Sequence, residues 1–83
     1  MQFIYFASVR EAIGRDSEEF ELPGDVATVT QCLDWLAEGS AQHKTAFADR
    51  AKLRFALDQQ MVQDDADISG AKELAIFPPV TGG

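Results

Sequence analysis

The segment at 28–39, TVTQCLDWLAEG, constrains the fold more than any other part of the chain. Thr28 and Gln31 have the spacing of a capping box, in which the two side chains satisfy free backbone groups at a helix start. Apolar residues then recur along one helix face, at Val29, Cys32, Leu33, Leu36 and Ala37. Gly39 is suited to end the helix. This amphipathic helix must bury its apolar face against another element, and it therefore predicts a sheet.

Short apolar segments supply the strands of that sheet. They lie at 2–7, 17–22, 53–57, 61–63 and 73–77, and are rich in aromatic and branched residues or alternate apolar with polar ones. A helical turn before Gly14 and a short second helix near 43–51, with Phe47 facing inward, are also predicted. Because this order is not a repeating βαβ pattern, it predicts an α+β fold, a β-grasp (ubiquitin-like) roll with a mixed sheet of about five strands and one main helix.

Composition excludes several classes of partner and site. The net charge of -7 repels phosphates and anionic lipids, so we expect neither nucleic acid nor membrane partners. A single cysteine, Cys32, excludes a disulfide framework and a four-thiolate metal site, and we interpret it as a buried packing residue. We interpret His43 as a surface imidazole and Asp64, Asp65 and Asp67 as a solvated turn. We therefore expect a cytoplasmic protein with no bound metal or cofactor.

Strand alternation predicts that both faces of the sheet are apolar. The helix is expected to cover Phe3, Tyr5, Leu53, Phe55, Leu57, Leu74 and Ile76. The opposite face then receives Ile4, Phe6, Ala56, Ala75 and Phe77, and Met61 borders them. Because a cluster of exposed apolar side chains marks an interface, we predict that Ile4, Phe6, Met61, Ala75 and Phe77 contact a partner. The alternative is that loops or a different strand register bury these residues.

The ending FPPVTGG is the second unusual feature. Pro78 and Pro79 cannot donate to a sheet, so we expect a domain at 1–77 and an extended tail at 78–83. Six extended residues reach roughly 20 Å, enough to enter another protein's active site. The threading residues are Pro78, Pro79, Val80, Thr81 and Gly82. Gly82 and Gly83 have no side chains, which allows a narrow channel and leaves the Gly83 carboxylate unhindered.

The chain resembles the family of molybdopterin synthase small subunits, which are sulfur carriers of the ubiquitin-like superfamily. The resemblance is carried by FPPVTGG and by YFASVRE after the first strand, and it spans the whole chain in length and element order. Asp58 departs from the asparagine expected there, and SGAKEL lacks the usual acidic turn before the last strand.

The resemblance implies a reaction cycle in which this chain is a carrier and not a catalyst on its own. A separate adenylating enzyme uses ATP to convert the Gly83 carboxylate to an acyl-adenylate, and sulfur then replaces the activated oxygen to give a thiocarboxylate. The tail inserts into the large synthase subunit, where the sulfur attacks a pyranopterin precursor. Two deliveries build the dithiolene that binds molybdenum or tungsten. The general base and the phosphate-binding cations are expected from the partner proteins.

Three further functions share parts of this pattern. The sulfur carrier of thiazole synthesis has the same fold and two terminal glycines, and a ubiquitin-like protein modifier shares the activation step. Both of these protein types lack the FPPV segment that precedes the end of this chain. The third is a non-catalytic β-grasp interaction domain with an apolar patch and an inert tail.

Overall fold

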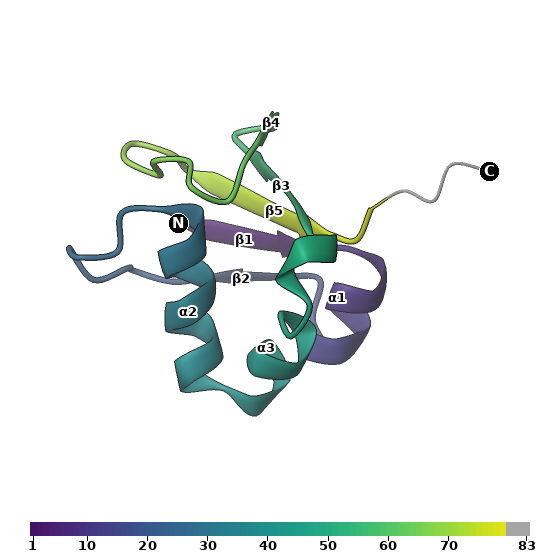
Figure 1. Cartoon of the computed structure of the whole chain (residues 1–83). Helices are drawn as coiled ribbons and strands as arrows, with labels where there is room; N and C mark the ends of the chain where they lie inside the picture. Colours follow the sequence, from purple (N-terminus) through teal and green to yellow (C-terminus); the bar gives the residue numbers. More distant parts are fainter. Residues whose placement is uncertain (80–83) are drawn as a thin grey trace.

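The computed structural model describes residues 1–79 and places a sheet above a layer of helices (Figure 1). In chain order the elements are β1 (Gln2–Tyr5), α1 (Ala7–Ile13), β2 (Ser17–Glu19), α2 (Val29–Gly39), α3 (Ala41–Ala46), the 3₁₀ helix η1 (Arg50–Lys52), β3 (Arg54–Leu57), β4 (Gln60–Val62) and β5 (Glu73–Phe77). Over the described residues the strands form one sheet of five, in the order β2-β1-β5-β3-β4.

The sheet is mixed, which confirms the predicted α+β, β-grasp architecture. β1 pairs with β5 in parallel, with Phe3 opposite Leu74. β1 and β2 are antiparallel, as are β3 and β5 and the β3–β4 pair. Parallel pairing of the first and last strands requires a crossover connection, and the chain between them contains the helical layer that covers one face.

Helix α2 begins where the sequence predicts, and its predicted apolar face is buried except at Ala37, which is only half-buried. Both halves of the capping box are present, and the Thr28 hydroxyl accepts a hydrogen bond from the backbone N–H of Gln31. The buried residues of α2 are Val29, Cys32, Leu33 and Leu36. They join one core with Phe3, Tyr5, Phe55, Leu74 and Ile76 from the sheet, and with Phe47, which is buried as predicted.

The first strand is shorter than predicted, because helix α1 begins at Ala7 and not beyond it. Ala7 has a φ of 51°, a left-handed conformation that is unfavourable for a residue with a side chain. This bend turns the chain out of the sheet directly after Phe6. The α1 helix ends at Gly14, which has a φ of 86° and caps the helix as predicted.

A tight turn joins β3 to β4. Asp58 and Gln59 both have positive φ. A two-residue hairpin turn whose twist matches the right-handed twist of its strands requires this conformation. The Asp58 carboxylate also accepts hydrogen bonds from the backbone N–H groups of Lys72 and Glu73, at 2.9 and 3.0 Å. Aspartate in place of the expected asparagine therefore ties this turn to the start of β5.

Candidate functional site

The outer face of the sheet carries a row of small and apolar residues that crosses four strands. Ile4 on β1 is opposite Ala75 on β5, which is opposite Ala56 on β3, which is opposite Met61 on β4. Phe6 and Phe77 form a second group beside this row. Phe77 is opposite Arg54, and Phe6 donates its backbone N–H to the Ile76 carbonyl. We call Ile4, Phe6, Ala56, Met61, Ala75 and Phe77 the outer-face patch. The predicted face assignment is therefore correct.

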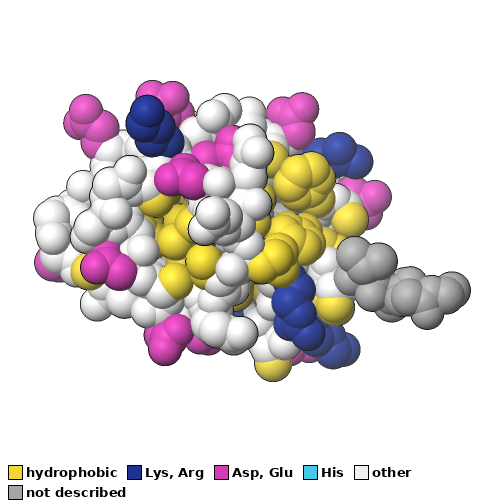
Figure 2. Space-filling view, turned by 90° about the horizontal axis from the view of Figure 1, so that it is seen from above, with side chains coloured by type: hydrophobic (Ala, Val, Ile, Leu, Met, Phe, Trp, Pro, Cys, Tyr) yellow, Lys and Arg dark blue, Asp and Glu magenta, His cyan; other side chains and the backbone are white. Residues whose placement is uncertain are grey.

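The patch is open to solvent at its edges. Met61 is 63% exposed and Phe6 is 46% exposed, the largest exposures of big apolar side chains among the described residues. Figure 2 shows hydrophobic side chains gathered over the middle of this face, with white backbone and other side chains between them and acidic and basic side chains around them. Ala75 differs from the others because it is only 8% exposed. It forms the floor of the patch between Ile4 and Ala56, so we expect its contribution to a contact to be small.

Phe6 and Phe77 form one aromatic unit at the end of β5. Their rings meet edge to face with centroids 6.1 Å apart, a favourable geometry for two aromatic rings. Phe77 is the last residue of β5, and the half-buried Pro78 and Pro79 follow it. The aromatic unit therefore lies where the chain leaves the sheet. The predicted tail residues Val80, Thr81, Gly82 and Gly83 lie outside the described residues.

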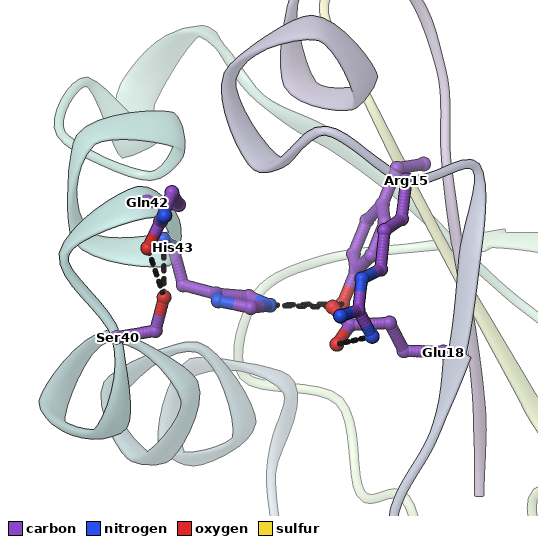
Figure 3. Close-up of polar contacts among 6 residues, drawn as sticks. Arg15, Glu18, Ser40, Gln42 and His43 are labelled. Carbon is purple, nitrogen blue, oxygen red and sulfur yellow. Dashed lines mark hydrogen bonds and ion pairs between the residues drawn. The ribbon is translucent and has the colours of Figure 1, made fainter.

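His43 is buried, so its predicted position at the surface was wrong. It reaches from α3 to β2, where its Nε2 lies 2.6 Å from the Oε1 of Glu18 (Figure 3). The Tyr5 hydroxyl donates to the same Glu18 oxygen at 3.1 Å, and Arg15 lies 3.7 Å from the other one. The sequence contained a sign of this contact that the prediction did not use. Glu18 is two residues before Phe20 in the predicted strand, so strand alternation points both side chains inward. An inward carboxylate needs a polar partner.

The buried polar cluster of Tyr5, Glu18 and His43 lies on the helix side of the sheet, away from the outer-face patch. Burial, and secondly the negative charge of Glu18, raise the pKa of the Tyr5 phenol well above its usual value. Burial likewise raises the pKa of the Cys32 thiol to about 11, so this thiol is a packing residue as predicted. We assign the cluster a structural role, because it joins β1, β2 and α3.

Tyr5 gives the fold a dependence on alkaline pH. Its folded pKa is raised above the unfolded value of about 10, so its stabilising contribution is complete below pH 10 and is lost as the pH rises further. We expect the free energy of unfolding to fall above pH 10, and to fall less steeply in Tyr5→Phe. Denaturant unfolding of both proteins across this range measures the two slopes. Both retain Cys32, so the difference isolates Tyr5, and parallel slopes would contradict the assignment.

Loss of His43 should destabilise the fold through the carboxylate that it leaves behind. We expect His43→Leu to lower the free energy of unfolding by about 3 kcal/mol, because it removes the partner that lies 2.6 Å from a Glu18 carboxylate of which only 9% is exposed. The double variant Glu18→Leu with His43→Leu removes that charge and should recover much of the loss. Chemical denaturation compares the two variants. A double variant less stable than the single one would show that the cost comes from loss of the pair itself, and not from the carboxylate left without its histidine.

Residues 1–79 contain neither a cluster of potential metal ligands nor a helix suited to cross a membrane. No group of three or more histidine, cysteine, aspartate or glutamate side chains in this part of the chain is placed to hold a metal ion. No helix among the same residues has both the length and the apolar character needed to span a bilayer.

Comparison with known proteins shows one matching family and several similar proteins. The model of the ThiS family matches residues 3–83. A relative from Escherichia coli, described as a molybdopterin synthase sulfur carrier subunit, is 36% identical over all of this chain and 99% of its own length. A relative of the same description from Haemophilus influenzae is 32% identical with the same coverage. The solved structure of the Haloferax volcanii small archaeal modifier protein 1 is 25% identical, with a TM-score of 0.73 over 96% of this chain and 97% of its own.

Proposed function

Because this chain belongs to the ThiS family, we propose that it is the sulfur carrier subunit of a molybdopterin synthase and that Gly83 carries the sulfur. The observation that carries the proposal is the match to relatives of that description over essentially their whole length. The structure supports it through the partly exposed Phe6–Phe77 unit at the end of β5, where a docked partner would receive the emerging chain.

The chemistry requires activation of the Gly83 carboxylate. A carboxylate resists attack because it is anionic and has no good leaving group. In the proposed cycle a carboxylate oxygen attacks the α-phosphorus of ATP on an adenylating enzyme, which releases pyrophosphate and leaves an acyl-adenylate. Sulfur at the oxidation level of sulfide, supplied as hydrosulfide by a donor, then forms the new carbon–sulfur bond while the carbon–oxygen bond to AMP breaks, and AMP leaves with that oxygen. The product is a thiocarboxylate at Gly83.

The second half-cycle takes place in the large synthase subunit. The thiocarboxylate sulfur attacks a carbon of the pyranopterin precursor and displaces the oxygen substituent of that carbon, so that the precursor is joined to Gly83 through a thioester. Water then cleaves the bond between sulfur and the Gly83 carbonyl, so that sulfur stays on the precursor and the carboxylate is regenerated. Two deliveries supply the two sulfur atoms of the dithiolene. We place the protein and both partners in the cytoplasm.

In this proposal the chain binds its partner proteins and presents its C-terminal tail to them, and the partners catalyse the reactions. The outer-face patch docks on the large subunit, and the tail residues from Pro78 to Gly82 thread into its active site. His43 and Glu18 are unsuited to serve as bases for the reaction, because they are buried against each other on the helix side of the sheet. The base and the phosphate-binding cations are therefore assigned to the partners.

A protein modifier is the second candidate function, and the fold similarity to the small archaeal modifier protein 1 favours it. The activation step would be the same, but a lysine amine would attack the acyl group and form an amide. A role in thiazole synthesis and a role as a non-catalytic interaction domain receive no separate support from the described residues.

A complementation experiment separates these functions. The chain is expressed in Escherichia coli lacking its own molybdopterin synthase carrier subunit, and separately in a strain lacking the thiazole-synthesis carrier. We expect molybdenum-enzyme activity to return in the first strain and thiamine dependence to persist in the second. A matched chain without Gly83 is the control in both. Rescue of only the thiamine requirement would overturn the proposal, as would covalent attachment to other proteins without rescue of either strain.

A further inference from the structure

A second surface lies on the helix side of the molecule, around the chain's single tryptophan, Trp35. One hollow of about 320 Å³ is lined mainly by apolar atoms from Phe20, Trp35 and Leu36, and it extends to His43. A second hollow, of about 390 Å³, is lined by Pro23, Asp25, Val26, Gln31 and Asp34. Trp35 and Glu38 line both hollows, so the two are adjacent. We call the pair the Trp35 groove.

The aromatic wall of the groove is fixed in place. Trp35 is half-buried and meets Phe20 edge to face, with ring centroids 5.6 Å apart. Phe20 in turn packs against Phe3 in the core at 6.0 Å. A half-exposed tryptophan that is held by the core is a favourable contact residue, because little side-chain entropy is lost when it binds.

The rim of the groove is acidic. Asp25, Asp34 and Glu38 are all exposed on it. Asp34 is paired with Arg50 at 2.6 Å, whereas Asp25 and Glu38 have no ion-pair partner within residues 1–79. Lys44 shares a neighbouring hollow with Glu38 without forming an ion pair with it there. The groove therefore offers two free carboxylates beside an apolar hollow.

We propose that the Trp35 groove binds an extended basic segment of a partner protein. An apolar side chain of the segment fills the hollow between Phe20, Trp35 and Leu36. A lysine or arginine close to it in sequence crosses the Trp35 ring and meets Asp25 and Glu38, where a cation gains from both the aromatic face and the carboxylates. Acidic segments are excluded by the same carboxylates and by the net charge of -7.

This surface is separate from the outer-face patch. The helices, including α2 with Trp35, cover the face of the sheet opposite to the patch (Figure 1). A partner on the groove therefore leaves the patch accessible, and the two surfaces can be occupied at the same time. The inference does not depend on the proposed sulfur-carrier function.

Selection from a random library of 12-residue displayed peptides tests the inference. Wild-type chain is the bait, and a second bait carries Asp25→Lys with Glu38→Lys. A control bait carries Glu19→Lys with Asp65→Lys, which makes the same charge change at exposed residues outside the groove. We expect the wild-type and control baits to enrich peptides with lysine or arginine near an apolar residue. The groove variant should lose that enrichment.

The emission of Trp35 then reports binding of one enriched peptide, since no other tryptophan is present. We expect a saturable change, a dissociation constant about tenfold or more higher in the groove variant, and an unchanged value in Phe77→Asp. Enrichment shared equally by the groove variant, no enrichment with any bait, or binding abolished by Phe77→Asp would each overturn the inference.

Discussion

Removal of Gly83 is expected to abolish sulfur transfer while leaving the fold unchanged. In the proposed cycle the Gly83 carboxylate is the group that is adenylated and then carries the sulfur, so a shortened chain presents its carboxylate one residue too early. Addition of one residue after Gly83 should have the same effect, because it replaces the carboxylate by an amide. Reconstituted synthase assays with the adenylating enzyme, ATP and a sulfur source measure transfer, and thermal unfolding measures the fold.

The two tail variants control for each other, since one shortens the chain and the other lengthens it. Among residues 1–79 the last one in the buried core is Ile76, and neither variant changes any of these residues. Both should therefore unfold at the wild-type temperature. Normal cofactor synthesis by the extended chain, with its extra residue still attached, would contradict the assignment of Gly83.

Replacement of Phe77 by aspartate is expected to weaken binding to the large synthase subunit by tens of fold or more. Loss of an aromatic interface anchor costs about 2 kcal/mol or more, and burying an unpaired carboxylate adds a desolvation penalty. The isolated domain should lose only about 1 kcal/mol of stability, because Phe77 is half-buried and contributes mainly its edge-to-face contact with Phe6. Calorimetric titration and thermal unfolding of the same preparation give both values.

Ile76→Asp is the matched control for Phe77→Asp, since it introduces the same carboxylate one residue earlier on β5. Ile76 is 0% exposed and faces the core, so this variant should fail to fold or unfold at a much lower temperature. Wild-type affinity of a stable Phe77→Asp protein would remove the outer-face patch from the mechanism. Severe unfolding of Phe77→Asp would show that Phe77 supports the core instead.

The parts of the fold that could be predicted are those with a local signal. The capping box at Thr28 and the helical period after it fixed the start and the buried face of α2. Strand alternation placed Phe3 and Tyr5 inward and Ile4 outward. These features depend on residues that are close in sequence, so the local sequence pattern is enough to predict them.

The parts that could not be predicted depend on contacts between distant residues. His43 and Glu18 are 25 positions apart, and only the packing of α3 against β2 brings them together. The end of β1 was placed too late because Ala7, an ordinary helix former, adopts a left-handed conformation that its residue type does not indicate. Ala75 is buried because Ile4 and Ala56 lie beside it on two other strands. These neighbours are known only once the strand pairing is known.

Intact mass spectrometry of the protein purified from its native host tests the central claim most directly. We expect a fraction of molecules heavier by the difference between one sulfur and one oxygen atom, with the added mass confined to the peptide that contains Gly83. Treatment with an alkylating reagent should modify that peptide as well, because a thiocarboxylate sulfur is nucleophilic. Only the unmodified mass, in protein from cells that are making the cofactor and contain the adenylating enzyme, would contradict the role of Gly83 as the sulfur carrier.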